Sequence, residues 1–433
     1  MSRRQLRPLI LALIVFAISC TILAPFTVDN AFVAFRYAEQ LAQGNGIKFN
    51  ADGPETEGFV SWLWLIASAV ATRAGASIPA SMMWLSALIG ALTIVVLWRH
   101  LVTEERSEFE VALPLIFLAA SAPYALYAVS GTECTLFSLL LLLTVLISGR
   151  VSSRRSATGI AILAVCAILL ALCRPEGVFA LPVIAVIQRL TRRPDRTTMV
   201  SALIVVLFVG AFYVWRTIHF GSLLPPPYWN SVATPVFQRI TGNFHTYFIA
   251  QGYDFPAFGC YYVAITIVAL IGWSIAGRTR AGTETAALGV CAVLATTYFF
   301  FVDLTPGMYY HATLVPVLLV PGVHAAGALG RAIDKVFTNR GGSARLVVIV
   351  SALVISAGWV ADLRLVSKRL HYANEATLVG LGKWLGENMP PGSLLATDAP
   401  GMIPYYSRLE TAAIQPHPIT GKGGVEFSLD VFF

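Results

Sequence analysis

Long apolar runs with few charges recur along the chain and predict its architecture. A helix that crosses a membrane needs about 20 mostly apolar residues, and eleven runs approach this length. They cover residues 8–26, 80–98, 111–128, 131–148, 158–173, 177–190, 199–215, 257–277, 285–302, 310–329 and 346–361. A twelfth run, 58–71, is shorter and lies just before Arg73. The pattern predicts an all-α polytopic membrane protein with about eleven transmembrane helices.

The basic residues predict the orientation of these helices, because cytoplasmic loops carry an excess of Lys and Arg. If 58–71 lies in the membrane plane, 18 of the 30 Lys and Arg residues fall on one side and only six lie in the short segments opposite. If 58–71 crosses the membrane, every later loop changes side and this bias is reversed. We therefore expect an in-plane helix at 58–71, a cytoplasmic N-terminus and an extracytoplasmic C-terminus.

The composition agrees with a membrane protein and excludes soluble and disordered classes. Hydrophobic residues make up 57% and charged residues 12% of the 433 positions, whereas soluble domains are about 25% charged. The cytoplasmic loops account for the positive net charge, so no nucleic-acid partner is expected. The six cysteines lie within or beside apolar runs, without the spacing of a metal site, and are expected to pack as small apolar residues.

Three segments are expected on the extracytoplasmic side, and function is to be sought there. They are a first loop (residues 27–79), a second loop (218–256) and a C-terminal cap (362–433), and residues 1–361 form the transmembrane module. In the cap, a Pro-Pro-Gly turn at 390–392 precedes the apolar residues 394–396, which are typical of one strand. We therefore expect the cap to be a small α/β unit.

The first loop begins with an amphipathic pattern that places a carboxylate at the membrane surface. Ala31, Phe35 and Ala38 recur at helical spacing with Arg36 opposite, and Gly44 ends the run. Asp29 and Asn30 then stand at the start of the helix. Two interpretations remain open: one of these residues is the N-cap of the helix, or the carboxylate accepts a proton from an acceptor hydroxyl.

Further charges lie beside apolar runs, where they are costly and therefore informative. On the expected topology they all fall at the extracytoplasmic ends of helices: Glu133, Arg174, Glu176, Arg216 and Asp303. Each one taken singly is explained as an interfacial anchor or as part of an ion pair. Arg216 and His219, one helical turn apart, are also suited to hold one phosphate group.

Several motifs follow one another along the chain. The first loop contains Asp29-Asn30-Ala31-Phe32, Phe35-Arg36-Tyr37-Ala38, Gly44-Asn45-Gly46, Asn50, Glu57-Gly58-Phe59 and Trp62-Leu63-Trp64. Later motifs are Ser130-Gly131-Thr132-Glu133, Arg174-Pro175-Glu176-Gly177, Trp215-Arg216 with Phe220-Gly221 and Leu224-Pro225, and residues 399–406. In this order they resemble the motifs of bacterial GT-C glycosyltransferases similar to the terminal arabinofuranosyltransferases, and the resemblance covers nearly the whole chain.

The resemblance implies an inverting glycosyltransferase of the bacterial inner membrane that uses a polyprenyl-phosphate sugar as donor. The first suggestion for the sugar is arabinofuranose, and the acceptor is an envelope glycan or a glycoprotein. Asp29 corresponds to the general base, and Arg174, Arg216, Arg36 and His219 are candidates for binding the donor phosphate. The candidates for positioning sugar or acceptor are Glu133, Glu176, Asn30, Glu57 and Tyr37.

Departures from the family pattern limit these assignments. Asn30 replaces the second acidic residue of the family's pair, so a divalent metal is possible but not indicated, and Cys134 replaces the usual Thr after Glu133. The active site and the C-terminus are expected on the periplasmic side.

Two other functions remain open: a flippase or transporter of lipid-linked sugars, which should show repeat symmetry, and a polysaccharide polymerase or ligase.

Overall fold

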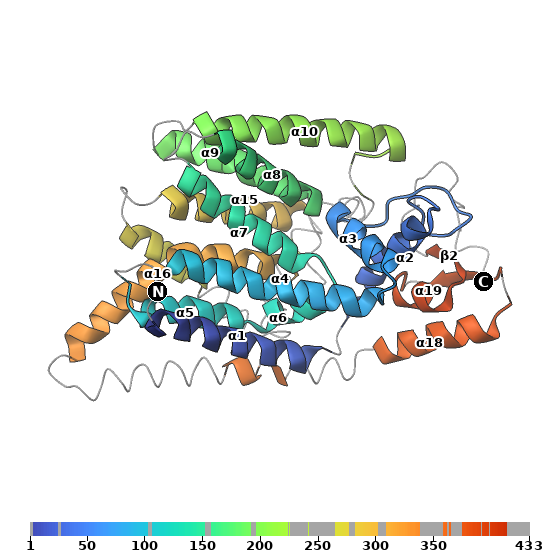
Figure 1. Cartoon of the computed structure of the whole chain (residues 1–433), viewed down its shortest axis with the longest axis horizontal. Coiled ribbons are helices and arrows are strands. Elements are labelled where there is room, and N and C mark those ends of the chain that lie inside the picture. The colour runs from blue at the N-terminus through green and yellow to red at the C-terminus, as the bar shows by residue number, and fades with distance from the viewer. Residues whose placement is uncertain are drawn as a thin grey trace.

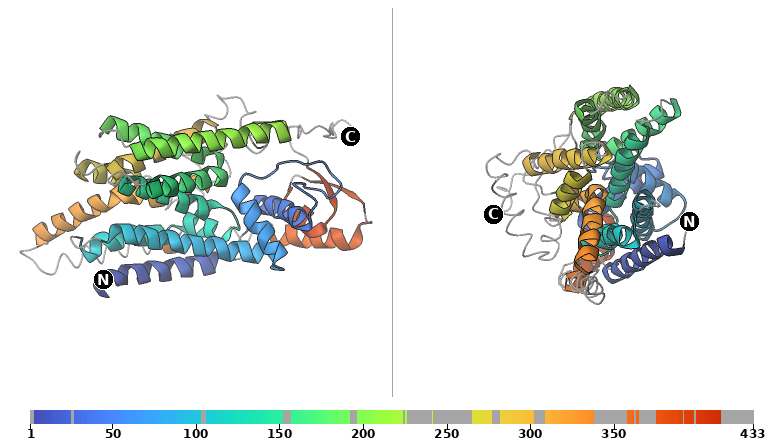
Figure 2. Two further views of the ribbon diagram at one scale, coloured as in Figure 1. Left: turned by 45° about the horizontal axis from the view of Figure 1, so that its top comes forward. Right: turned by 90° about the vertical axis from the view of Figure 1, so that its left-hand side faces the viewer.

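Long helices lie side by side along one axis, and short elements from the first loop and the C-terminal region gather at one end, the capped end (Figures 1 and 2). The computed structural model describes residues 3–24, 27–102, 106–151, 157–191, 196–223, 225, 241, 265–276, 282–301, 309–337, 358–361, 363–364, 375–390, 392–397 and 399–413. The N-terminus lies at the end of the helix bundle opposite to the capped end (Figure 1).

Within the described residues, five helices are long and apolar enough to cross a membrane. They are α1 (Arg3–Leu23), α4 (Ile78–Leu101), α7 (Cys134–Val151), α10 (Arg196–Phe220) and α16 (Tyr309–Phe337). The outer face of α1 exposes Ile10, Ile14 and Ile18, while Ala12 and Phe16 are buried against the bundle. Such an apolar exposed face suits a lipid environment, and the chain is a multi-pass membrane protein.

The predicted continuous span at 111–128 is a bent pair of helices. Helix α5 (Glu108–Ala119) and helix α6 (Ala122–Val129) meet at an angle of 54° and are counted as a sixth span if taken together. Between them, Ser121 caps α6 by accepting the backbone N–H of Tyr124. Pro123 in the first turn of α6 fits this restart, because proline is tolerated at a helix start and disrupts a helix interior.

The remaining helices of the bundle are shorter or only partly described. They are α8 (Ala157–Cys173), the 3-10 helix η1 (Pro175–Phe179), α9 (Ala180–Thr191), an apolar helix over Ile265–Ala276 and α15 (Gly282–Phe301). The predicted run at 346–361 lies mostly outside the described residues. The predicted number of eleven spans therefore stays a prediction.

The capped end combines helices of the first loop with the described part of the predicted cap. Its elements are α2 (Asp29–Gln43), α3 (Trp62–Arg73), α18 (Glu375–Asn388), β1 (Leu394–Thr397), α19 (Met402–Ser407) and β2 (Glu410–Ala413). The predicted strand at 394–396 is confirmed as β1, which pairs in parallel with β2 from Leu394–Glu410 to Thr397–Ala413. Helix α19 supplies the crossover that parallel strands require.

The local predictions for the first loop agree with its two helices. Helix α2 begins at Asp29 and ends before Gly44, whose φ of 87° lies in the left-handed region that favours glycine. Helix α3 has 12 residues and is therefore about 18 Å long, shorter than the roughly 30 Å of a bilayer core. This length supports the expectation that 58–71 does not cross. Helix α10 extends to Phe220, so the second loop begins later than residue 218, and most of it lies outside the described residues.

Candidate functional site

Asp29 stands in the first turn of α2, and its carboxylate binds the C-terminal region. Its Oδ2 accepts the backbone N–H of Gly401 at 3.0 Å, and its Oδ1 accepts that of Met402 at 2.7 Å. The N-cap of α2 is Val28, without a side-chain hydrogen bond. The interpretation that Asp29 or Asn30 caps α2 is therefore wrong. Asp29 instead caps α19, and Asn30 is exposed.

Arg36 is buried, with 6% of its surface exposed, although the periodicity of α2 places it opposite the apolar residues. Its Nε donates to Phe49 O, its Nη1 to Pro404 O, and its Nη2 to Leu409 O and Asn50 Oδ1. Burial lowers the pKa of Arg36 to about 10. The C-terminal region covers Arg36, and four of its N–H donors bind protein oxygens. Its role in binding the donor phosphate stays a prediction.

Tyr37 shapes the segment that leads to Glu57. Its hydroxyl lies 2.7 Å from Thr56 Oγ1 and accepts the backbone N–H of Gly58 at 3.0 Å. Burial raises the pKa of Tyr37 to about 12. A Cβ at Gly58 would lie 3.0 Å from the Tyr37 ring, so the two residues fit closely. Tyr37 thus holds the backbone immediately after Glu57.

Glu57 and Arg216 form a buried ion pair between the first loop and the end of α10. The indole Nε1 of Trp62 donates to Glu57 Oε1 at 2.9 Å. Nη1 of Arg216 donates to the carbonyls of Ser222 and Leu223. Burial raises the pKa of Glu57, while Arg216 and Trp62 act in the opposite direction. The pair therefore fixes the start of the second loop against the first loop.

His219 does not share a ligand with Arg216. Its Nε2 lies 3.0 Å from Glu55 Oε2, and both side chains are partly exposed. The imidazole stacks on the Trp215 ring with centroids 5.3 Å apart. Two carboxylates of the first loop, Glu57 and Glu55, thus contact Arg216 and His219 separately. The joint phosphate site of Arg216 and His219 stays a prediction.

Arg174 lies in a buried aromatic and acidic environment after α8. Its Nε is 2.7 Å from Glu176 Oε1, and the two side chains are 1% and 3% exposed. The guanidinium lies over the ring of Tyr310 at 4.5 Å and that of Phe137 at 5.3 Å. The Tyr298 hydroxyl donates to Glu176 Oε1 at 3.2 Å. Residues of η1, α7, α15 and α16 therefore fix the orientation of this guanidinium.

Glu133 ends a tight turn between α6 and α7. Gly131 adopts a φ of 78° there, and its carbonyl accepts the indole N–H of Trp64 at 2.7 Å. The backbone N–H of Val28 lies 3.5 Å from the Ser130 carbonyl. Glu133 itself is 8% exposed. The turn that carries Glu133 is thus in contact with the segment that precedes Asp29.

Further contacts connect the buried charges at this end of the bundle. Cys173 directly precedes Arg174 in the sequence, and its thiol lies 4.0 Å from the backbone carbonyl oxygen of Glu133. The Arg216 guanidinium lies 5.8 Å from the centroid of the Tyr213 ring. Glu133 therefore lies near the Arg174–Glu176 pair, and these residues together with the Glu57–Arg216 pair are called the polar region. Asp303 lies outside the described residues.

Some residues that contribute to this region were not recognised in the sequence. Tyr298 and Tyr310 lie in apolar runs. The Tyr298 hydroxyl donates to Glu176, and the Tyr310 ring lies against the guanidinium of Arg174. A buried tyrosine usually has a hydrogen-bond partner, so a tyrosine in a span was a usable signal. Gly401 belongs to a recognised motif, but its sequence carries no sign that it contacts Asp29.

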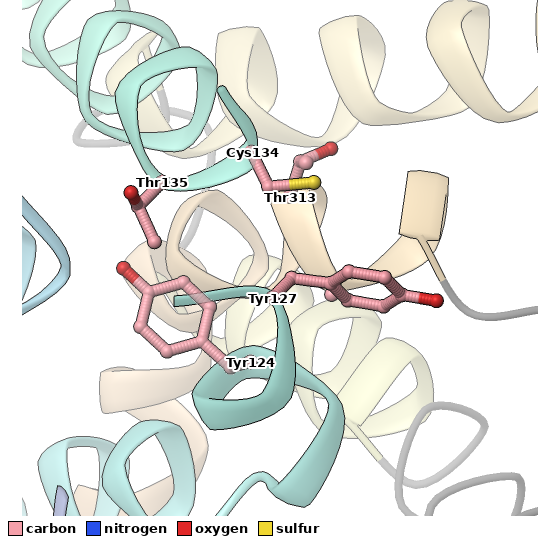
Figure 3. Close-up of a pocket in the computed structure, with 6 residues that line it drawn as sticks. Tyr124, Tyr127, Cys134, Thr135 and Thr313 are labelled. Atoms are coloured by element: carbon pink, nitrogen blue, oxygen red, sulfur yellow. The ribbon is translucent and has the colours of Figure 1, made fainter. Parts of the chain in front are cut away.

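The described residues contain no metal-ligating cluster, and one small cavity lies beside the predicted site residues. No group of three or more His, Cys, Asp or Glu side chains among the described residues is arranged for a metal ion. A small cavity next to the turn of Glu133 is lined by Tyr124, Tyr127, Cys134, Thr135, Ala312 and Thr313 (Figure 3). It has no space for a water molecule, so a sugar does not fit into it.

Solved membrane-protein structures share this arrangement over nearly the whole chain. ArnT from Cupriavidus metallidurans bound to undecaprenyl phosphate matches with a TM-score of 0.57 and 13% identity, over 96% of this chain and 86% of that chain. The archaeal oligosaccharyltransferase AglB from Archaeoglobus fulgidus, in complex with an inhibitory peptide and a dolichol-phosphate, matches with a TM-score of 0.56 and 13% identity over 96% of this chain. The chain has the GT-C fold.

The similarity is one of fold. The chain spans about three fifths of AglB, since the match covers 61% of that protein. A third structure, the Archaeoglobus fulgidus oligosaccharyltransferase in complex with Zn and sulfate, has a TM-score of 0.59 and 12% identity over 92% of this chain and 62% of that chain. No protein-family model and no curated protein matches the sequence. The relationship to arabinofuranosyltransferases therefore stays a prediction.

Proposed function

We propose that this protein is an inverting glycosyltransferase that takes a sugar from a polyprenyl-phosphate donor. The observation that carries the proposal is the common fold with ArnT bound to undecaprenyl phosphate, over 96% of this chain and 86% of that chain. AglB, which has the same fold, is in complex with a dolichol-phosphate. Two proteins of this fold thus bind a polyprenyl phosphate, and the motifs of the first loop favour arabinofuranose as the sugar.

The polar region at the capped end supplies the groups that such a reaction requires. In a single displacement, the acceptor hydroxyl attacks the anomeric carbon, the bond from that carbon to the phosphate oxygen breaks, and polyprenyl phosphate leaves. Asp29 takes the proton of the hydroxyl. Arg174 and Arg216 stabilise the negative charge on the leaving phosphate, since guanidinium groups bind phosphate oxygens well.

The ion pairs of the two arginines have a consequence for this proposal. Arg174 and Arg216 are each 1% exposed and each binds a carboxylate. A donor phosphate therefore has to share the guanidinium with Glu176 or Glu57, or to displace that carboxylate. Glu133 and Glu176 then position either sugar hydroxyls or the guanidinium groups. The buried pairs keep the cations in place before the donor arrives.

The acceptor and the location of the reaction extend the proposal. The Archaeoglobus fulgidus oligosaccharyltransferase has been solved tethered to an acceptor peptide, so a protein acceptor suits this fold as well as an envelope glycan. The distribution of basic residues supports a cytoplasmic N-terminus in a bacterial inner membrane. The capped end, with the active site, then faces the periplasm.

Purified protein in lipid nanodiscs tests the function directly. We would supply polyprenyl phosphates that carry arabinofuranose or hexoses, together with glycan and peptide acceptors, and measure polyprenyl phosphate release and acceptor glycosylation by mass spectrometry. The wild type should release the lipid only as sugar is transferred, and Asp29→Asn should abolish transfer while the protein stays folded. Asp52→Asn, which changes an exposed acid of the same loop, is the matched control.

The same material separates the proposal from its alternatives. A flippase would move a labelled lipid-linked sugar across proteoliposomes without cleaving it. A polymerase or ligase would require an acceptor or donor that carries a lipid-linked glycan longer than one sugar. Full transfer activity in Asp29→Asn would remove Asp29 from the mechanism, and transport without cleavage would refute the glycosyltransferase.

A further inference from the structure

Three polar side chains of the first loop bind the backbone of one C-terminal segment, residues 401–411. Asp29 accepts the N–H groups of Gly401 and Met402, and Arg36 donates to carbonyls at positions 404 and 409. Asn50 donates to the carbonyl of Thr411 at 3.0 Å and accepts its N–H at 3.1 Å. The first loop therefore recognises this segment mainly through backbone groups.

The two charged residues bind opposite ends of α19. Asp29 and Arg36 are seven positions apart on α2, so they lie on one face of that helix, about 10 Å apart along its axis. Helix α19 has six residues, which gives a length of about 9 Å. The acid thus meets the N–H groups at the start of α19 and the cation meets carbonyls toward its end, the arrangement that a helix dipole favours.

Close packing joins the same two helices. Met402 and Tyr405 are 1% and 8% exposed and belong to a buried cluster with Phe32 and Phe35. The rings of Phe32 and Tyr405 have centroids 5.2 Å apart. An ion pair joins the exposed Arg408 of the C-terminal segment to the half-buried Glu39 of α2. The polar bonds therefore lie beside an apolar interface that excludes water.

Gly401 allows the approach of the segment to Asp29. A Cβ at this position would lie 1.8 Å from the backbone oxygen of Asp29 and 2.9 Å from its carboxyl carbon. The first of these neighbours is backbone at the start of α2, which does not move as a side chain does. Any side chain at position 401 would therefore separate α19 from Asp29.

We propose that residues 401–411 are part of the active site, and that Gly401 and Met402 are positioning residues for the carboxylate of Asp29. This inference rests on the proposed function of Asp29 as general base. The two backbone N–H groups hold both carboxylate oxygens in one orientation. The carboxylate of Asp29 is thereby oriented by backbone groups of the C-terminal segment and not by another side chain.

Hydrogen exchange tests the contact without any assumption about catalysis. Amide exchange of peptides covering 401–411 would be measured by mass spectrometry in the wild type, in Asp29→Ala and in Gly401→Ala. We expect exchange in this segment to be at least about tenfold faster in both variants, because a lost tenfold in protection corresponds to about 1.4 kcal/mol, the order of a hydrogen bond to a charged group. Gly380→Ala is the control, since a Cβ at Gly380 meets nothing within 4 Å. Unchanged protection in Asp29→Ala would refute the contact.

Steady-state kinetics test the positioning role. In Gly401→Ala, kcat should fall by about 100-fold, the scale of a 1 Å misplacement of a catalytic group, while KM for the donor stays within about twofold. Gly380→Ala should keep both constants. Two results in Gly401→Ala would refute the positioning role. One is a higher KM for the donor with an unchanged kcat, and the other is a wild-type kcat although residues 401–411 exchange faster.

A second variant guards against a folding failure of Gly401→Ala. Asn50→Ala removes the two bonds to Thr411 and the bond from Arg36, but it leaves Gly401 and Asp29 intact. It should therefore loosen the segment and lower kcat to a smaller extent. Faster amide exchange of residues 401–411 in Asn50→Ala together with an unchanged kcat would count against the positioning role. If the wild type transfers no sugar, the proposed function fails and the catalytic part of the inference fails with it, whereas the exchange experiment still decides the contact.

Discussion

Glu57 and Arg216 form an ion pair in which each side chain is 1% exposed, and the pair joins the first loop to α10. Arg216→Met leaves a buried carboxylate without its cation and the carbonyls of Ser222 and Leu223 without a donor. We expect this variant to lose about 3–5 kcal/mol of unfolding free energy, the usual cost of breaking a buried pair. Unfolding in detergent micelles measures the loss.

The double variant Arg216→Met/Glu57→Gln is the control for this prediction. It removes the unpaired carboxylate and should recover part of the stability that Arg216→Met loses. A double variant that is no more stable than Arg216→Met would show that the carboxylate of Glu57 is not the source of the loss.

The Arg216→Met variant should also depend on pH. Without Arg216, burial dominates the pKa of Glu57 and raises it further above the reference value of 4.5. When the pKa of a carboxyl group is higher in the folded than in the unfolded protein, the group stabilises the fold at pH values below its pKa in the unfolded chain. This stabilisation is lost as the pH rises through its pKa in the folded protein. The stability deficit against the wild type should therefore grow as the pH rises above the reference value of 4.5. The deficit of the double variant should stay constant, and a deficit that shrinks with pH would contradict the sign.

Arg174→Lys tests the phosphate-binding role of Arg174. Lysine keeps the charge but loses the planar group that lies over Tyr310 and binds Glu176. We expect KM for the polyprenyl-phosphate donor to rise about ten- to hundredfold, since hydrogen bonds to charged groups are worth about 1.5–3 kcal/mol. Arg189→Lys, at an exposed arginine of α9, is the control. An unchanged KM in Arg174→Lys would exclude a direct role in donor binding.

Gly177→Ala should disturb the turn that carries Arg174. A Cβ at Gly177 would lie 2.5 Å from the backbone oxygen of Leu170, so η1 has to move away from α8, at a cost of about 1–3 kcal/mol. Gly210→Ala in α10 is the matched control, because a Cβ there meets nothing within 4 Å. It should be neutral or stabilising by up to about 1 kcal/mol. Equal unfolding midpoints for the two variants would contradict this prediction.

Local features of the first loop could be predicted because they depend on neighbouring residues. Helix α2 ends before Gly44, as the glycine after the last apolar residue indicated. The apolar residues 394–396 after a turn indicated a strand, which the structure extends to Thr397. The bend between α5 and α6 was missed because hydropathy continues across Ser121 and Pro123, although both residues favour a new helix start.

The partners of the polar residues could not be predicted in the same way. Arg36 lies on the polar side of α2 by periodicity and is nevertheless buried, because a segment far along the chain covers it. Gly401 is an ordinary loop glycine in the sequence and becomes irreplaceable only beside the backbone of Asp29. Arg174 and Arg216 were expected to face a donor phosphate, and the structure gives each of them a carboxylate partner.

The sequence by itself determined that this chain is a helical membrane protein, because lipid requires long apolar helices and the cost of a charge in lipid confines most charges to loops and helix ends. It also determined which charged residues lie at those ends. Only the tertiary structure decided that Asp29 binds α19, that Glu57 binds Arg216 and that Arg174 binds Glu176. Such pairs depend on the packing of distant segments, and a charged side chain carries no local sign of which partner will compensate its burial.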